Sequence, residues 1–292
     1  MPTVTRTGGF AVGFRMGWSD WQKNPATVAA WAKANGFSAV DVGRNGEVAG
    51  KAVKAAGLRV GSVDLAEWNA MLSPDAGKRK AAVKKNAAYV KAVAAAIGSA
   101  NHFTVMLPED PARERKDNFK FMVESFRALA PVMEAAKASL VIEGWPGPGA
   151  LVCTPEGYRA FFKAVPSKAM KVNFDPSHLI RMGIDPMRFL REFAGRVGHV
   201  HGKDTELFPE AIYDLGTEQP PTFARGHGFG SATWRYTLPG HGIFNWVQGF
   251  TILAAAGYKG CVCVELEDEN FNGKTETEQR GLLLSRAYLE GC

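Results

Sequence analysis

Residues 171–201, KVNFDPSHLIRMGIDPMRFLREFAGRVGHVH, hold one complete strand–helix–strand unit. The runs 171–175 and 197–201 are short and bounded by turn residues, as strands of a buried parallel sheet are. Periodic apolar residues between them predict a helix over 185–195. The first strand ends at Asp175 and the second at His201. Two neighbouring strands therefore end in side chains that can bind a metal or carry a proton.

The same alternation extends over the whole chain. Strands are expected at 10–15, 39–42, 59–64, 103–107, 140–143, 171–175, 197–201 and 261–265. Helices are expected at about 25–35, 47–56, 75–97, 112–138, 155–165, 185–195, 244–256 and 275–290. Eight such pairs favour an α/β fold of the closed (β/α)8 type, the TIM barrel, over an open doubly wound sheet. With 292 residues, one domain over 1–292 is expected.

One connection is much longer than the rest. After the seventh strand, residues 203–242 contain glycine, proline, aromatic and charged residues without a clear period. Connections between strand and helix usually take about 2–6 residues. We interpret 203–242 as an insertion that forms a long loop on the catalytic face of the barrel, where such segments act as lids or binding loops.

Composition excludes several classes of function. No run is long and apolar enough for a membrane helix, and residues 1–18 lack a signal-peptide pattern, so we expect a soluble, cytoplasmic protein without membrane partners. The formal charge is +6, but its densest run, 78–85, reads as one solvated helix face, so we expect no nucleic-acid partner. Cys261 and Cys263 are expected to be small core residues of a strand.

Four residues of metal-ligand type end four consecutive strands: Glu143, Asp175, His201 and Glu265. Barrel active sites form at the C-terminal strand ends, so these side chains should converge. Side chains alternate along a strand, which places Val141, Asn173, His199 and Cys263 one layer deeper on the same face. His199 is therefore interpreted as a hydrogen-bonded residue behind the ligands. Three carboxylates and an imidazole suit one divalent metal, Mn²⁺, Mg²⁺, Co²⁺ or Zn²⁺.

The segments VNFDPSHL, HVHGKD, WRYTLPGHGIFNW and AGYKGCVCVELED, within residues 140–268, resemble the sugar phosphate isomerase/epimerase family. These are xylose-isomerase-like barrels that also include the AP endonuclease 2 group. The resemblance implies that Glu143, Asp175, His201 and Glu265 are the metal ligands. It also implies that Glu143 and Glu265 take and return a proton of a sugar substrate.

Further residues follow from the resemblance or from their place in the chain. His178 matches a histidine that contacts substrate in some members, and Pro176 and Ser177 suggest that it is exposed in a turn. Lys203 either neutralises a substrate anion or pairs with Asp204. The remaining candidates for substrate binding are Arg235 and His241 in the insertion, and Glu67 and Trp68 after the third strand. His102 should precede the fourth strand at the opposite rim and be structural.

Several functions stay open at this point. A metal-dependent isomerase or epimerase acting through an enediolate is the first reading. Leu207 stands where ketohexose epimerases of the family carry arginine, and WRYTLPGHG resembles a subgroup associated with oxidised glycosides, so a lyase that cleaves 3-keto-glycosides, O- or C-linked, is the rival. An abasic-site endonuclease is a remote reading, because the earlier strands supply no histidines at their C-terminal ends. A homo-oligomer, or a subunit that needs a partner chain, is also open.

Overall fold

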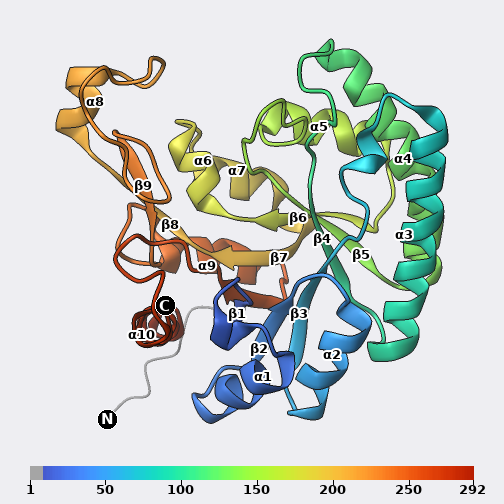
Figure 1. Ribbon diagram of the computed structural model, residues 1–292, viewed down its shortest axis with the longest axis horizontal. Coiled ribbons are helices and arrows are strands. Elements are labelled where there is room, and N and C mark those ends of the chain that lie inside the picture. The colour runs from blue at the N-terminus through green and yellow to red at the C-terminus, as the bar shows by residue number, and fades with distance from the viewer. Residues whose placement is uncertain (1–8) are drawn as a thin grey trace.

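The barrel strands of the computed structural model, which describes residues 9–292, are β1 (Ala11–Arg15), β2 (Ala39–Val42), β3 (Arg59–Asp64), β4 (Asn101–Val105), β5 (Ser139–Glu143), β6 (Met170–Phe174), β7 (Val197–Gly202) and β10 (Cys261–Val264). All are parallel and close in the order β1-β10-β7-β6-β5-β4-β3-β2 (Figure 1). This confirms the expected (β/α)8 barrel. We expected no signal peptide in residues 1–18; of these, residues 1–8 lie outside the described residues.

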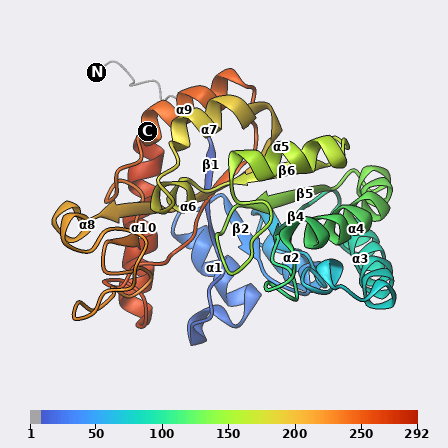
Figure 2. The ribbon, with the colours of Figure 1, turned by 90° about the horizontal axis from the view of Figure 1, so that it is seen from above.

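Helices surround the barrel when it is seen from above (Figure 2). The α-helices are α1 (Pro25–Ala34), α2 (Gly46–Ala55), α3 (Ala76–Ile97), α4 (Arg115–Ala135), α5 (Pro155–Ala164), α6 (Pro176–Arg181), α7 (Pro186–Phe193), α8 (Pro209–Leu215), α9 (Trp246–Ala255) and α10 (Thr275–Gly291). Short 3₁₀ turns lie at η1 (Asp20–Gln22), η2 (Ala70–Leu72) and η3 (Ala194–Arg196). Many helices begin at a side-chain cap: Asn24, Thr154 and Asn245, for example, each accept a backbone N–H bond.

The small residues inside the barrel fill its lower part. Ala39, Cys261 and Cys263 form their own buried cluster, which confirms the two cysteines as core residues of a strand. Gly61 belongs to the same layer, and a Cβ atom there would lie 2.2 Å from an oxygen of Asp41. The floor beneath the strand ends is therefore densely filled, so the side chains above it are supported from below.

The fourth strand begins two residues earlier than expected. We predicted 103–107, whereas β4 spans Asn101–Val105. Asn101 extends the strand because its amide donates to the carbonyls of Gly61 and Gly198, both at 3.1 Å. His102, which we placed before the strand at the opposite rim, is instead a fully buried residue within it. Its ring lies 5.8 Å from that of Tyr89 on α3.

The buried His102 predicts a specific pH dependence of stability. Burial lowers the pKa of this imidazole to about 4, below its ordinary value of 6.5. The folded protein therefore takes up the proton less readily than the unfolded chain. The contribution of neutral His102 to the free energy of unfolding is complete above pH 6.5 and is lost as the pH falls towards 4. The loss should reach about 3 kcal/mol. Urea unfolding of His102→Leu and of the wild type between pH 4 and 7 measures it; parallel curves for the two proteins would show that His102 does not contribute.

The insertion carries secondary structure that its sequence pattern did not reveal. Strands β8 (Asp204–Leu207) and β9 (Trp234–Thr237) pair antiparallel, and α8 extends beyond them, at the upper left of Figure 1. Buried Asp204 fixes the base of this arm by accepting bonds from the backbone N–H groups of Thr205 and Phe244 and from the Trp246 indole. No residue of α8 is buried.

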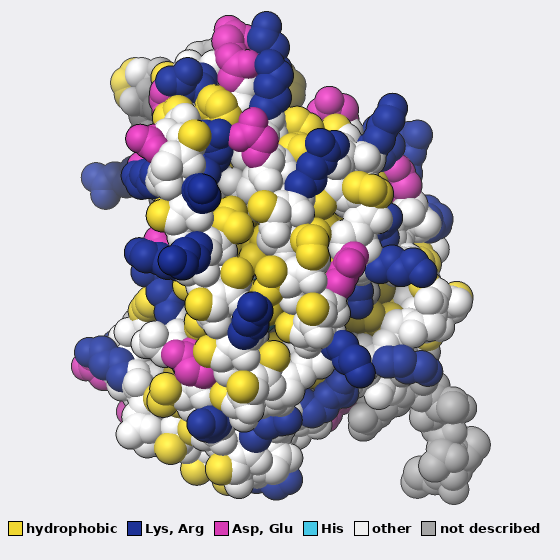
Figure 3. Space-filling model, turned by 90° about the vertical axis from the view of Figure 1, so that its right-hand side faces the viewer, with side chains coloured by type: hydrophobic (Ala, Val, Ile, Leu, Met, Phe, Trp, Pro, Cys, Tyr) yellow, Lys and Arg dark blue, Asp and Glu magenta, His cyan; other side chains and the backbone are white. Residues whose placement is uncertain are grey.

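The basic run 78–85 lies on α3, as expected. Lys78 and Lys85 pair with Glu109 and Glu67, and on the side of the molecule where α3 and α4 lie, Lys and Arg side chains stand apart among apolar and neutral atoms (Figure 3). These charges form a solvated face. Across residues 9–292 no helix combines the length and apolar character that crossing a bilayer requires.

Candidate metal centre

Four neighbouring barrel strands bring the expected ligand residues to one place. Glu143 is the last residue of β5, and Asp175 follows β6 directly. His201 lies near the end of β7, and Glu265 follows β10. Because β10, β7, β6 and β5 are adjacent in the barrel, their C-terminal ends share one rim. Ligand atoms of Glu143, Asp175, His178 and Glu265 lie within 4.8 Å of one another, whereas His201 forms a second such group with Asp41 and His199.

His201 contacts two of these carboxylates through one ring nitrogen. Its Nδ1 lies 2.6 Å from Glu143 Oε2 and 3.3 Å from Glu265 Oε2. Neither contact has hydrogen-bond geometry: Nδ1 is buried without a hydrogen-bond partner in the described part of the chain. The His201 ring nitrogen thus lies beside both carboxylates without a hydrogen bond to either.

His178 joins the same cluster, and its placement corrects our expectation. We expected a turn and an exposed ring, but Asp175 caps a helix that begins at once at Pro176, because Asp175 Oδ1 accepts the Ser177 N–H at 2.8 Å. The first turn of α6 carries His178 into the interior, where it is 1% exposed. Its Nε2 lies 3.2 Å from Glu143 Oε1 and its Nδ1 lies 2.7 Å from the Tyr236 hydroxyl.

Lys203 lies among the carboxylates. Its Nζ is 2.5 Å from Glu265 Oε2, 2.9 Å from Glu267 Oε2 and 3.3 Å from Asp175 Oδ2. The alternative that it pairs with Asp204 is wrong, since that carboxylate is occupied by the base of the insertion. Burial would lower the pKa of Lys203, but Asp175, Glu265 and Glu267 raise it well above its ordinary value. A fully buried ammonium ion is therefore part of the site.

The carboxylates remain charged despite their burial. Burial would raise the pKa of Glu143, and so would the neighbouring charge of Glu265. The imidazoles of His201 and His178 outweigh both and hold that pKa below its ordinary value. Burial would likewise raise the pKa of Glu265, but Lys203 and His201 hold it well below its ordinary value. Both glutamates are therefore ionised near neutral pH.

A second layer supports His201 from below. Asp41 Oδ2 lies 2.8 Å from His199 Nε2 and 3.5 Å from His201 Nε2, and all three side chains are fully buried. Burial would raise the pKa of Asp41, but the two imidazoles hold it below its ordinary value. In the same layer Asn173 donates to Glu143 Oε2 at 2.7 Å. His199 and Asn173 thus lie one layer below the ligands, as strand alternation predicts.

The other candidate residues lie in different surroundings. Arg235 is held by Glu206 at 2.8 Å and by Asp268 at 3.3 Å. His241 is exposed near the end of the insertion. Glu67 pairs with exposed Lys85 at 3.2 Å, and Trp68 packs half-buried against the outer core. None of these four belongs to the carboxylate cluster among residues 9–292.

Sequence reasoning missed several charged residues at the site, among them Arg15, Asp64 and Glu267. Arg15 Nε lies 3.3 Å from Glu265 Oε1, and its Nη2 donates to Asp64 at 2.8 Å. Arg15 and Asp64 are the last residues of the first and third expected strands, so the strand-end rule that found Glu143 would have found them had it been applied to the first half of the chain. Glu267 had no such signal, because it follows the last strand in a loop.

The donor set fits a divalent cation. Three carboxylates and an imidazole are mostly hard oxygen ligands, which Mn²⁺, Mg²⁺ and Co²⁺ accept readily. Asp175 Oδ2 and His201 Nδ1 are buried without a hydrogen-bond partner in the described chain, and both point into the cluster. Buried polar atoms without partners are rare in native proteins. A bound ion would satisfy them together.

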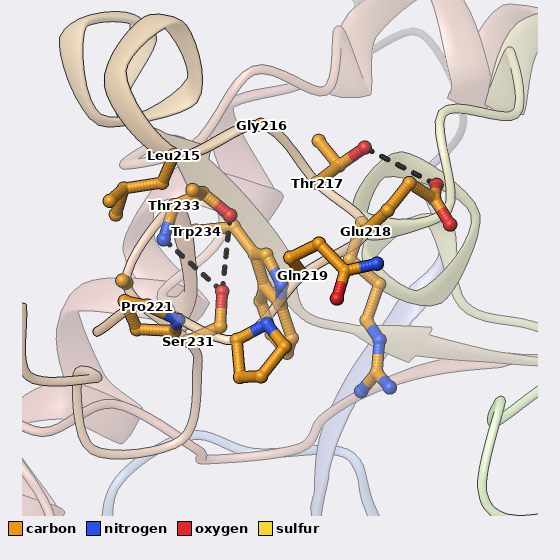
Figure 4. A pocket seen from close by; sticks show the side chains of 12 residues that line it. Leu215, Gly216, Thr217, Glu218, Gln219, Pro221, Ser231, Thr233 and Trp234 are labelled. Carbon is orange, nitrogen blue, oxygen red and sulfur yellow. Dashed lines mark hydrogen bonds between the residues drawn. The ribbon is translucent and has the colours of Figure 1, made fainter.

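A cavity of about 430 Å³ lies within the insertion, between residues 215–221 and Trp234 (Figure 4). Its polar side chains bond to one another, as Ser231 and Thr233 do at 3.2 Å. The three carboxylates of the cluster are not among its lining residues in the described chain. This cavity is therefore separate from the carboxylate cluster at the strand ends.

Comparisons with known proteins agree with the fold. An inosose dehydratase of Bacillus cereus (strain AH820) is 33% identical over 96 residues, 33% of this chain and 30% of that protein. The first two curated relatives are matched over only about a third of their own length. Two crystal structures are similar in fold. A 3-keto-D-glucoside 4-epimerase from E. coli has a TM-score of 0.69 and 16% identity, and the match covers 97% of this chain and 100% of that chain. A D-psicose 3-epimerase has a TM-score of 0.71 and 15% identity, with the same coverage of both chains.

The family described as xylose isomerase-like TIM barrel matches residues 26–287. This range begins in α1, ends in α10 and includes every strand except β1. The resemblance seen in residues 140–268 is thereby confirmed and extended to the first half of the chain. The protein belongs to the xylose isomerase-like TIM-barrel family.

Proposed function

We propose that this protein moves a proton on a sugar or sugar derivative, as an isomerase or epimerase, with one divalent metal held by Glu143, Asp175, His201 and Glu265. The observation that supports this most is the convergence of Glu143 and Glu265 on one nitrogen of His201. Epimerases and dehydratases among the similar proteins support the reaction class. His178 is a fifth candidate ligand or a substrate contact, since it shares the cluster.

The chemistry needs charge stabilisation and a base. A divalent metal, when bound, stabilises the negative charge that forms on a sugar carbonyl oxygen as a neighbouring C–H bond breaks. Glu143 and Glu265 are the groups that take the proton and return it. Lys203 keeps Glu265 ionised and near its position, because it binds Oε2 at 2.5 Å. The side-chain amide of Asn173 holds the Glu143 carboxylate in position, because it donates a hydrogen bond to Glu143 Oε2.

Proton exchange with solvent tests the proposal. The Mn²⁺-loaded protein would be incubated in D₂O with a panel of ketoses, aldoses and inososes, and carbon-bound deuterium would be measured by NMR and mass spectrometry. We expect deuterium at a carbon next to the carbonyl of at least one substrate, and none after EDTA treatment. Complete absence of exchange over the panel would contradict the proposal.

Elimination is a second candidate, favoured by the relative named an inosose dehydratase and by Lys203. An ammonium ion 2.5 Å from Glu265 could give its proton to a leaving oxygen as the enolate collapses. A 3-keto-glycoside or an inosose would then lose an alcohol or water. Release of aglycone or water together with deuterium exchange would identify a lyase; exchange without release would identify an isomerase or epimerase.

Asp41 should control metal affinity without being a ligand. It faces Nε2 of His201, whereas Nδ1 faces the carboxylates, so Asp41 orients the ring and favours the tautomer that leaves Nδ1 free to coordinate. Replacing Asp41 with Asn is expected to weaken Mn²⁺ or Co²⁺ binding by about 10–100-fold. Calorimetric titration measures this, and the absorption spectrum of bound Co²⁺ should change. Equal affinities for Asp41→Asn and the wild type would exclude this role.

A further inference from the structure

A cavity of about 330 Å³ opens beside Glu265, at the carboxyl ends of β1 and β10. One part of its lining is charged and comprises Arg15, Glu265 and Glu267. Another part is apolar and comprises Met16, Trp18, Phe229, Leu266 and Leu282. Because Glu265 belongs both to this cavity and to the carboxylate cluster, a molecule held at the cluster can extend directly into the cavity.

Trp18 stands at the cavity with 92% of its surface exposed. The chain on both sides of it is fixed. The N–H of Gly17 donates to Gln22 Oε1 at 2.6 Å, and the Ser19 hydroxyl donates to Glu278 Oε2 at 2.5 Å. A large aromatic side chain exposed on an anchored segment offers apolar surface that a bound group can bury. Trp18 therefore has the placement of a ligand contact.

Phe229 reaches the cavity from the insertion. Its φ of 57° is in the left-handed region, which bulky residues rarely adopt. The surrounding chain holds it there, because the Phe229 carbonyl accepts the Tyr236 N–H at 2.9 Å and the Gly228 N–H donates to Glu269 at 2.8 Å. The ring remains 43% exposed. Strain of this kind is common where a structure presents a side chain to a ligand.

Arg15 supplies a polar contact between the cavity and the cluster. Its guanidinium lies 4.5 Å from the centre of the Phe103 ring and is held by Asp64 and Glu265. Its Nη1 is buried and has no hydrogen-bond partner within residues 9–292. A buried donor without an acceptor is costly unless a ligand supplies one. An oxygen of a bound sugar beside Glu265 would do so.

We infer that this cavity binds a planar or apolar group attached to the sugar, so that the substrate is a glycoside with an aromatic or similarly flat aglycone. The sugar lies at Arg15 and Glu265, and the aglycone lies against Trp18 and Phe229. A free monosaccharide would leave both aromatic rings in water. The placement of the sugar rests on the proposed function, whereas the aromatic contacts rest on the cavity alone.

Paired glycosides test this inference. Affinities of the Mn²⁺-loaded protein would be measured calorimetrically for 4-nitrophenyl and methyl glycosides of glucose, galactose and xylose, in both anomers. Burial of the nitrophenyl ring should make at least one such glycoside bind about tenfold more tightly than its methyl partner. Trp18→Ala and Phe229→Ala should each reduce the preference to less than about threefold. Trp18→Phe should retain most of it. Tyr213→Ala should retain all of it, because exposed Tyr213 on α8 is not among the residues that line this cavity in the described chain.

Each outcome decides the inference. Equal affinities within every pair, or no binding of any glycoside, would overturn it. A preference that survives both alanine variants would also overturn it, because the ring would then bind elsewhere. Circular dichroism checks the fold of each variant. If the preference and its loss are seen but no deuterium exchange occurs with any substrate, the proposed function fails and the aglycone site stands.

Discussion

Replacing Glu143 with glutamine is expected to lower the rate of substrate deuterium exchange by about 10³–10⁴-fold, because it removes both a proton acceptor and a charged ligand. The amide keeps the size of the side chain, so the fold should remain. The change leaves His178 and His201 without the carboxylate that both contact. The measurement is single-turnover exchange in D₂O at saturating Mn²⁺, so that weaker metal binding is separated from slower proton transfer.

Glu192→Gln is the matched control, since this carboxylate pairs with Arg159 on the outer helices at 2.8 Å. Its rate should stay within about twofold of the wild type. If Glu143→Gln and Glu192→Gln exchanged deuterium equally fast, Glu143 would have no part in the reaction. A loss that excess metal restores fully would assign Glu143 to metal binding alone.

Removing the buried ammonium group should destabilise the metal-free protein strongly. In Lys203→Met, the carboxylates of Glu265, Glu267 and Asp175 lose their common cation, and breaking one side of a buried ion pair costs about 3–5 kcal/mol. Bound metal supplies positive charge to the same carboxylates. Saturating Mn²⁺ at about 100 times Kd should therefore restore about 2.7 kcal/mol. Urea unfolding with EDTA and with Mn²⁺ measures both effects.

Lys85→Met is the corresponding surface control. Its ammonium pairs with Glu67 at 3.2 Å, but the lysine side chain is 68% exposed. Exposed pairs contribute at most about 1 kcal/mol. Similar unfolding free energies for the two variants in EDTA would mean that Lys203 does not compensate the carboxylates. A large loss for Lys203→Met that Mn²⁺ leaves unchanged would mean that no ion binds beside it.

The sequence predicted the barrel and most of the cluster because both depend on local pattern. Glu143, Asp175 and Glu265 were found from the ends of apolar runs, and strand alternation placed His199 and Asn173 below them. These rules use only neighbours along the chain and the closure of the barrel. They hold here although the pairing of β6 with β7 has a register irregularity between Val172 and Asn173.

The rest depended on contacts between distant segments. The sequence did not predict the partners of Lys203, which are Asp175 and Glu265. These two residues come from other strands, so their approach to Lys203 depends on how the barrel closes. Asp-Pro begins both turns and helices, so the burial of His178 in α6 could not be read from its neighbours. The partner of Asp41, His199, is 158 positions away. Whether two such distant residues meet depends on the register of the strands around the barrel.

The arm of β8, α8 and β9 leaves the barrel and returns to it side by side, with Asp204 opposite Thr237. A segment whose two ends meet can change length at small entropic cost, since loop closure depends only weakly on residue number. Residues 208–233 can therefore change in length while the strand ends that carry the carboxylate cluster stay in place.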